Sequence, residues 1–274
     1  MKLNILNERG KIMKSVKKYQ VTNILSFIGI ITVNFLANYL PLNGYTTGEL
    51  SDMYPNLFVP AGITFSIWGI IYLFLLGFII YQSRGLINNI NRPPNIVAQI
   101  GWLFLISSLA NIGWIFAWHF LKVFLSLCLM IILLISLIAI YLKLNIGNNN
   151  FRGAKKFFVN IPFSLYLGWI TIATIANITA WLVSINWGGW GISDITWTII
   201  VLIIGVILTS FNIFKRGDII YSLVVIWAYL GIIIKRYQAD PRYMSIIFTA
   251  AIGIIVIIFN LIYVKRKNKK RRFY

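Results

Sequence analysis

Aromatic and amide side chains recur at helical spacing in this sequence, and these residue types are suited to binding a ligand. Trp68 and Tyr72 lie four positions apart, so one helix would present both rings on the same face. Asn111 and Trp114 are three positions apart and would also share a face. A later segment repeats the pattern in steps of four, with Trp169, Ala173, Asn177 and Trp181. Because rings stack on flat apolar molecules and amides hydrogen-bond their polar atoms, the pattern favours binding.

The sequence has few of the residues that catalysis or metal binding requires. The chain has one cysteine, Cys128, and one histidine, His119, which are too few for a zinc cluster. His119 could ligate a heme iron, but its position near the end of an apolar segment favours an interfacial residue. Glu49 and Asp52 could act as acid and base, but without a histidine or metal partner we interpret them as solvated side chains. We expect no enzyme, no catalytic residue and no metal site.

The segments that carry these residues are too apolar for a soluble protein. Hydrophobic residues make up 59% of the 274 and charged residues 11%, whereas soluble domains are about one quarter charged. A helix needs about 20 apolar residues to cross a bilayer, and no segment alternates as a β-barrel strand would. Eight segments are long enough, at 19–40, 61–82, 97–120, 123–143, 157–184, 194–214, 218–235 and 243–264. We therefore predict an all-α bundle of about eight transmembrane helices.

Lysine and arginine are distributed unevenly among the connections. If the eight helices alternate in direction, twenty-one of the 25 basic residues lie on one side, together with both chain ends. They include the basic tails 1–18 and 265–274, as well as Arg84 and Arg92. The excess of basic residues predicts that this side, with both termini, is cytoplasmic. The net charge of +19 then reflects topology and attraction to the lipid bilayer, so we expect no nucleic-acid partner.

On this topology the aromatic and amide stripes fall in the same outer half of the bilayer. Asn34 and Asn38 join them from the first span, and Trp68 would lie about 10 Å deep. The long outer connection 41–60 has no lysine or arginine and would form a lid. These features predict a lidded pocket, although helix packing explains the stripes about equally well. We interpret Trp118, Trp187, Trp190 and Trp197 instead as residues of the membrane-interface belt.

Three motifs at these positions resemble the tryptophan-rich sensory protein / translocator protein family, also called the peripheral benzodiazepine receptor family. They are Pro60-x7-Trp68-x3-Tyr72, Asn111-x2-Trp114 and Tyr166-x2-Trp169-x3-Ala173-Thr174-x2-Asn177-x3-Trp181. The resemblance covers about residues 19–184. It implies a five-helix core with a pocket under the loop 41–60 that binds porphyrins, heme, sterols or benzodiazepine-type drugs. It further implies that the ligand is bound at Trp68, Tyr72, Asn111, Trp114, Trp169, Ala173, Asn177 and Trp181.

Two departures narrow what the resemblance implies. Where the family commonly has Trp-x-Pro-Pro before its second helix, this chain has Leu57-Phe58-Val59-Pro60, which argues against porphyrin breakdown. At the sterol-recognition positions of animal members it has Ile178 and Leu182, which argues against sterols.

The expectation is therefore a receptor or sensor in the bacterial cytoplasmic membrane that binds a planar, hydrophobic, tetrapyrrole-like molecule. A porphyrin or heme would be its ligand, and no cofactor would be required. A passive facilitator or exporter that uses the same pocket and a structural or regulatory subunit are the alternatives. Residues 185–264 would add three helices, to which we assign only packing or oligomerisation, with a homodimer as one possible assembly.

Overall fold

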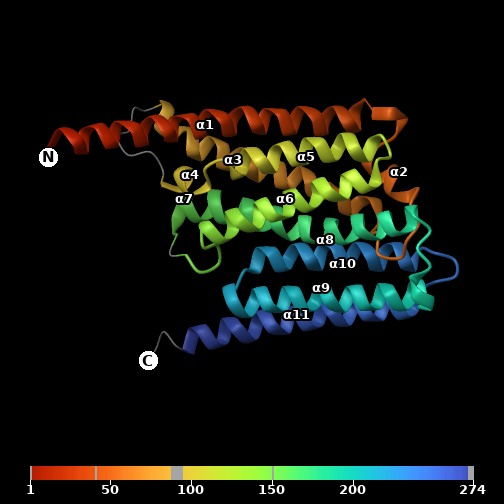
Figure 1. Cartoon of the computed structure of the whole chain (residues 1–274). Helices are drawn as coiled ribbons and strands as arrows, with labels where there is room; N and C mark the ends of the chain where they lie inside the picture. The colour runs from red at the N-terminus through yellow and green to blue at the C-terminus, as the bar shows by residue number, and fades with distance from the viewer. Residues whose placement is uncertain (1, 41, 88–94, 150, 271–274) are drawn as a thin grey trace.

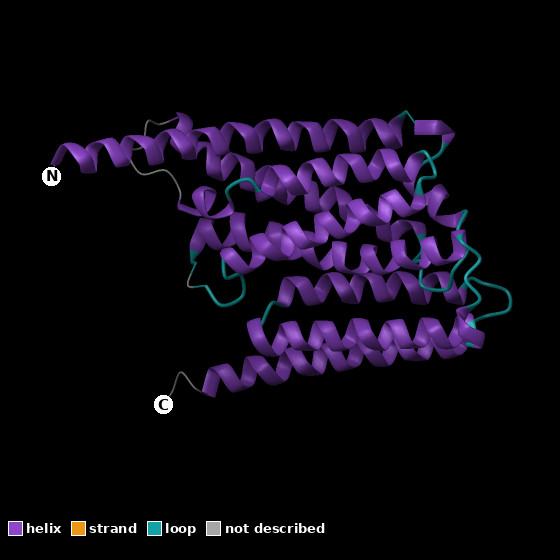
Figure 2. Ribbon diagram, in the orientation of Figure 1, coloured by secondary structure: helices purple, strands orange, loops and turns teal. Residues whose placement is uncertain are grey.

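The computed structural model describes residues 2–40, 42–87, 95–149 and 151–270, and within these ranges the chain forms helices and no strands (Figures 1 and 2). The helices are α1 (Lys2–Tyr39), α2 (Thr47–Asp52), α3 (Ile67–Ile87), α4 (Asn95–Ile100), α5 (Leu103–His119), α6 (Val123–Lys143), α7 (Gly153–Lys155), α8 (Ile161–Ser184), α9 (Asp194–Arg216), α10 (Ile219–Tyr237) and α11 (Met244–Lys270). Short turns lie between them, η1 (Leu42–Gly44), η2 (Gly62–Ser66), η3 (Lys156–Asn160) and η4 (Gly189–Gly191). Four parts of the sequence predictions lie outside the described residues, namely the first residue of the basic tail 1–18, Arg92, the first residue of the loop 41–60 and the last four residues of the basic tail 265–274.

The long helices run side by side as a bundle. Helix α1 begins and helix α11 ends at the same end of the molecule, which we call the terminal end (Figure 1). Helix α2 and the connection 42–60 lie at the opposite end, which we call the loop end. Seven of the described helices are long and apolar enough to cross a membrane, and α5 is a shorter apolar helix beside them. The chain is thus a multi-pass membrane protein, and the predicted polytopic helix bundle is confirmed.

The prediction of one continuous helix over 97–120 is wrong. Helix α4 stops at Ile100, and Gly101 follows in the left-handed conformation with φ +56°. The Gly101 amide donates a hydrogen bond of 2.9 Å to the carbonyl of Val97, which closes the last turn of α4. Helix α5 then begins at Leu103 and has 17 residues, or about 25 Å of helix. A glycine that tolerates positive φ therefore separates two helices where apolar composition predicts one.

Helix α10 connects the last two long helices, α9 and α11, to the rest of the bundle. Helix α1 packs on α3 and α5, α6 packs on α5 and α8, and α10 packs on α8, α9 and α11. Two glycines permit close contact along α10. A Cβ atom at Gly168 would lie 3.0 Å from the Cβ of Val224, and one at Gly231 would overlap the Oγ1 of Thr64 in η2. The Ala61 amide also donates a hydrogen bond of 3.0 Å to the Gly231 carbonyl, so α10 directly supports the start of the second span.

A buried carboxylate links α6, α8 and α10 by hydrogen bonds at the terminal end. Asp218 is the N-cap of α10, and its Oδ1 accepts hydrogen bonds from the amides of Ile220 and Tyr221 at 3.1 and 3.2 Å. Its Oδ2 accepts from the hydroxyls of Tyr141 on α6 and Ser164 on α8, at 2.7 and 2.6 Å. A buried charge is tolerated only when it is well hydrogen-bonded, and this carboxylate has four donors. We call this arrangement the Asp218 joint.

Candidate functional site

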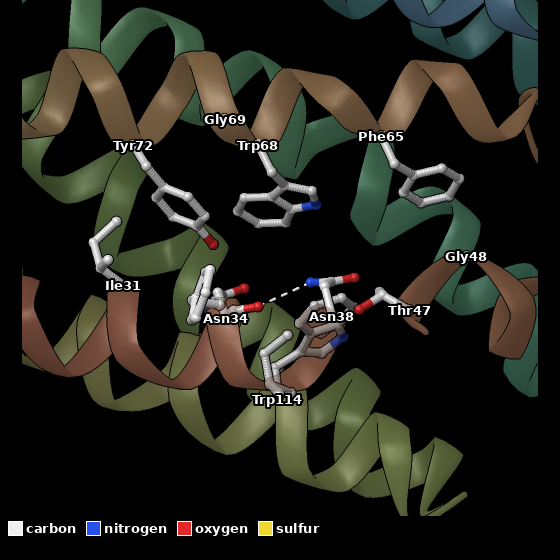
Figure 3. A pocket seen from close by; sticks show the side chains of 12 residues that line it. Ile31, Asn34, Asn38, Thr47, Gly48, Phe65, Trp68, Gly69, Tyr72 and Trp114 are labelled. Atoms are coloured by element: carbon white, nitrogen blue, oxygen red, sulfur yellow. Dashed lines mark hydrogen bonds between the residues drawn. The ribbon is translucent and has the colours of Figure 1, made fainter. Parts of the chain in front are cut away.

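A cavity of about 450 Å³ lies between α1, α2, α3 and α5 towards the loop end. In Figure 3, α3 forms one wall and α1 the opposite wall, the rings of Trp68 and Tyr72 point from α3 towards α1, and Trp114 of α5 lies on the side of α1. The lining residues are Ile31, Asn34, Phe35, Asn38, Thr47, Gly48, Phe65, Trp68, Gly69, Tyr72, Trp114 and Ile115. This volume is within the usual range for small-molecule sites. We call it the aromatic cavity.

Near-parallel rings form one side of the aromatic cavity. Trp68 stacks on Tyr72 with ring centroids 5.5 Å apart and 23° between the planes, and on Trp114 at 6.1 Å and 29°. Trp114 in turn stacks on Trp118 at 6.1 Å and 15°. The four rings come from α3 and α5, where a spacing of four residues places each pair on one face of its helix. Trp68, Tyr72 and Trp114 line the aromatic cavity, and Trp118 extends the stack beyond it. Their small interplanar angles produce a surface that suits a flat apolar molecule.

A smaller cavity of about 40 Å³ lies behind Trp68, between α2, η2, α3, α5 and α8. Trp169, Ala173 and Asn177 of α8 line it, together with Trp68 and Trp114, which also line the aromatic cavity. Its volume is close to that of a single water molecule, so only a small group could enter it without side-chain movement. Six of the eight residues predicted to bind the ligand therefore line one cavity or the other.

The remaining two predicted residues, Asn111 and Trp181, line neither cavity. Asn111 is fully buried, where its side-chain oxygen accepts from Asn34 at 2.8 Å and its nitrogen donates to the Tyr166 hydroxyl at 3.1 Å. It ties α1, α5 and α8 together beside the site. Trp181 packs instead on Phe124, with centroids 5.6 Å apart. Each step of four residues overshoots a full helical turn by about 40°, so three steps rotate Trp181 about 120° away from Trp169.

Several donors at the two cavities have no hydrogen-bond partner among the described residues. In the aromatic cavity these are the Oγ1 of Thr47, the hydroxyl of Tyr72 and the Nε1 of Trp114. The Nε1 of Trp169 is the corresponding atom in the smaller cavity. An unsatisfied buried polar atom costs about 1–3 kcal/mol, so such atoms are uncommon unless they serve a purpose. An indole nitrogen can only donate, and a ligand with acceptor atoms would satisfy these groups.

The aromatic cavity opens sideways between α1 and α3. Phe35 on α1 lines it and is 59% exposed, and Gly69 on the facing side of α3 is also exposed. Towards the terminal end, a buried amide cluster holds the same two helices together. There the side chain of Gln20 donates to the Gln82 carbonyl at 2.6 Å, and that of Asn23 donates to the Gln82 side chain at 2.8 Å. The cavity is thus accessible from the lipid-facing side and closed towards the terminal end.

The connection 42–60 folds into the site, as the lid prediction requires. Its helix α2 contributes Thr47 and Gly48 to the cavity lining. The N-terminus of α2 has a capping box, in which the Glu49 carboxylate accepts from the Thr46 amide at 2.7 Å and hydroxyl at 2.9 Å. These hydrogen bonds hold the pKa of Glu49 below its ordinary value, the backbone bond having the larger effect. Asp52 forms an ion pair with Lys235, so both acids of the loop make structural contacts.

Two residues that the sequence favours as interfacial are buried beneath this loop. Trp118 is 5% exposed and donates through its Nε1 to the Thr47 carbonyl at 3.3 Å. His119 is fully buried, with its Nδ1 2.9 Å from the Ile115 carbonyl, and it lines neither cavity. The interfacial interpretation of both residues is wrong, because the folded loop covers the end of α5. Trp190, by contrast, is 80% exposed and contacts the rings of Trp187 and Trp197.

Sequence reasoning missed seven lining residues of the aromatic cavity, namely Thr47 and Gly48 of the loop, Phe65 of η2, Gly69 of α3, Ile31 and Phe35 of α1, and Ile115 of α5. Thr47 and Gly48 lie within the capping box formed by Thr46 and Glu49, a sequence signal that predicts a helix but not where that helix packs. Phe65 lies three residues before Trp68, a spacing that could have included it in the stripe. Gly69 lines the cavity through its backbone and leaves no side-chain signal.

Comparison with known families matches residues 20–263 to the family described as TSPO-like protein. The chain belongs to this family, which confirms the resemblance to translocator and tryptophan-rich sensory proteins. The match continues through α9, α10 and α11, beyond the segment 19–184 that carries the motifs. Neither the comparison with curated proteins nor that with solved structures found a significant match.

Proposed function

We propose that this protein is a membrane receptor or sensor that binds a planar, hydrophobic, tetrapyrrole-like molecule in the aromatic cavity. The observation that carries the proposal is the coincidence of stacked rings and unpartnered donors on one cavity wall. Trp68, Tyr72 and Trp114 supply the rings, and Tyr72 and Trp114 also carry unpartnered donors. Stacking would hold the flat body of the ligand, and the indole and hydroxyl donors would bind its acceptor atoms.

The lining also limits the chemistry of the ligand. Among the described residues that line the aromatic cavity, none is charged. A carboxylate buried in such a lining would lose its hydration without gaining a cation, so acidic substituents would remain at the mouth. The ligand would thus enter by its apolar edge. Since the lining offers rings and amides but no acid–base pair, we propose a binding role without catalysis, in which a porphyrin or heme is ligand and not resident cofactor.

A passive facilitator or exporter is the second candidate, and the sideways opening between α1 and α3 favours it. Movement across the membrane also needs an exit, however, and the amide cluster of Gln20, Asn23 and Gln82 closes the cavity towards the terminal end. We therefore favour a receptor. Flux of a porphyrin through proteoliposomes would support the facilitator instead. A purely structural subunit would have no need for a 450 Å³ cavity with unsatisfied donors.

The proposed setting is a bacterial cytoplasmic membrane with both termini in the cytoplasm. Its support is the excess of lysine and arginine at the terminal end, where basic residues also lie in the described part of the connections, at Lys143, Lys155, Lys156, Lys215 and Arg216. The aromatic cavity would then face the outer half of the bilayer. A cysteine-accessibility experiment in intact cells at either terminus tests this orientation.

Titration of protoporphyrin into the purified protein tests the receptor proposal. We expect quenching of tryptophan fluorescence in the wild type, and Trp68→Ala to weaken binding about 10- to 30-fold because it removes the central ring of the stack. Trp190→Ala is the matched control, since that ring is exposed and distant from the aromatic cavity lining, and it should leave affinity unchanged. Unchanged fluorescence in the wild type, or equal affinities in the wild type and Trp68→Ala, contradicts the proposal.

A further inference from the structure

A separate cavity, of about 380 Å³, lies between α8 and α9 near the loop end, apart from the two cavities described above. Apolar side chains form its two walls, including Ile178 and Leu182 on α8 and Val201 and Ile204 on α9. Ile178 and Ile204 are exposed, so the cavity is a groove that opens onto the lipid-facing surface. The groove exists because α8 and α9 both pack on α10 and thus lie on either side of it. In a bilayer, hydrocarbon is the medium that contacts such a groove.

A polar cavity of about 760 Å³ continues from this groove at the loop end. The two cavities share four lining residues, namely Pro55, Asn56, Leu57 and Asp194. The polar cavity, which we call the vestibule, is also lined by Asp52, Lys235, Arg236 and Asp240. The two adjoining cavities are thus apolar where the groove faces lipid and charged in the vestibule at the loop end. Such a division matches an amphiphile with an acyl chain and a charged head.

Arg236 is the feature of the vestibule that points to a ligand. Its side chain is 6% exposed, yet it makes no hydrogen bond or ion pair with any described residue, and its Nε is buried without a partner. The neighbouring Lys235 pairs with Asp52, and the Tyr243 ring lies 5.7 Å from the Arg236 guanidinium. Asp52 is close enough to attract Arg236 electrostatically, but it makes its ion pair with Lys235 and none with Arg236. A largely buried guanidinium without a directly bound anion is unfavourable. Its planar set of donors matches the oxygen atoms of a phosphate group.

The acidic residues of the vestibule define the rest of the head group. Asp194 and Asp240 line it, are exposed, and make no ion pair among the described residues. A purely anionic head group beside Arg236 would be repelled by these carboxylates. A head group that carries an ammonium next to its phosphate would satisfy both signs of charge. A primary ammonium can also donate hydrogen bonds to the carboxylates, whereas a quaternary ammonium cannot.

We propose that the groove and the vestibule bind one zwitterionic phospholipid with a primary-amine head group, of the phosphatidylethanolamine type. Its phosphate contacts Arg236, its ammonium contacts Asp194 or Asp240, and an acyl chain lies between α8 and α9. The lipid would fill the space between the first five long helices and the last three. This site shares no lining residue with the aromatic cavity, so the inference does not depend on the proposed function.

Lipid retention by the purified full chain tests the site. The protein is reconstituted in phosphatidylcholine vesicles with about 10% phosphatidylethanolamine, solubilised in mild detergent and purified by gel filtration, and the retained lipid is quantified by mass spectrometry. We expect phosphatidylethanolamine to be enriched about five- to tenfold over its share in the vesicles. Arg236→Gln should abolish this enrichment. Arg242→Gln is the matched control, because Arg242 is exposed, packs on Tyr237 and does not line the vestibule.

Two further variants separate head group from tail. Asp194→Asn should keep phospholipid bound but reduce the preference for phosphatidylethanolamine over phosphatidylcholine. Leu182→Trp narrows the groove and should reduce retention of both lipids. Retained lipid with the composition of the vesicles, or equal enrichment in the wild type and Arg236→Gln, overturns the proposal. Preferential retention of phosphatidylglycerol in a parallel preparation overturns the role of the carboxylates.

Discussion

The two ends of the bundle treat their buried polar atoms in opposite ways. At the terminal end, both carboxylate oxygens of Asp218 accept two hydrogen bonds each, and Tyr141 is one of the donors. Near the loop end, the hydroxyl of Tyr72 and the indole nitrogen of Trp114 are buried with no partner among the described residues. Tyr141 and Tyr72 thus have the same buried phenol but different surroundings.

This difference separates a structural role, at the Asp218 joint, from the binding role that we propose for the aromatic cavity. A satisfied network stabilises the protein without needing anything from outside. Unsatisfied donors cost stability, and they are tolerated where a ligand repays that cost on binding. The comparison can be tested by removing each hydroxyl. Loss of the Tyr141 hydroxyl should lower the unfolding stability, whereas loss of the Tyr72 hydroxyl should not. The comparison also separates the two halves of the chain, since the Asp218 joint holds α10 to α6 and α8 while the aromatic cavity lies among α1, α3 and α5.

The largest effect is expected at the Asp218 joint. Asp218→Ala removes four accepted hydrogen bonds and leaves the Tyr141 and Ser164 hydroxyls buried, so the free energy of unfolding should fall by about 3 kcal/mol. Unfolding in detergent followed by circular dichroism measures the loss. Asp218→Asn keeps side-chain acceptor capacity and should lose less. An unfolding free energy equal to that of the wild type would contradict the structural role of this joint.

A smaller effect distinguishes the two tyrosines directly. Tyr72→Phe removes an unpartnered buried hydroxyl, so unfolding stability should stay equal or rise by up to about 1 kcal/mol, while protoporphyrin affinity falls about three- to tenfold. Tyr141→Phe removes a hydrogen bond to a carboxylate, so stability should fall by about 1.5 kcal/mol with affinity unchanged. Thermal unfolding and fluorescence titration on the same preparations measure both quantities. If Tyr72→Phe destabilises the protein and leaves affinity intact, the hydroxyl has a structural role.

The smallest effect concerns pH and the capping box of α2. The pKa of Glu49 is lowered below the ordinary value of 4.5 by hydrogen bonds from Thr46, so the ionised form stabilises the folded loop. This contribution is fully present above pH 4.5 and is lost as the pH falls through the lowered pKa. Limited proteolysis of the 42–60 connection should therefore become faster in strong acid. Glu49→Gln should remove that part of the pH dependence, and identical pH profiles for both proteins would exclude the capping box as its cause.

The sequence predicted the class of fold and much of the candidate site. Apolar runs of spanning length give the helices, because lipid leaves no other partner for the backbone. The spacing of four residues paired Trp68 with Tyr72, and the depth expected from the topology placed Trp114 near them; all three line the aromatic cavity. The same reasoning failed for Trp181, since a four-residue repeat drifts around the helix. It also failed for Trp118 and His119, whose burial depends on a loop that lies far from them in sequence.

The sequence by itself determined that the chain is a membrane helix bundle with aromatic and amide stripes, because hydropathy and periodicity are local properties of the chain. Tertiary structure alone decided which polar atoms find partners. Asp218 meets Tyr141 and Ser164 only because α6, α8 and α10 converge, and Asp52 makes its ion pair with Lys235 and not with the neighbouring Arg236. Hydrogen bonds between distant segments depend on distances of a few tenths of an ångström. Residue types and spacing do not specify those distances, and here the distances are what distinguishes the Asp218 joint from the proposed binding site.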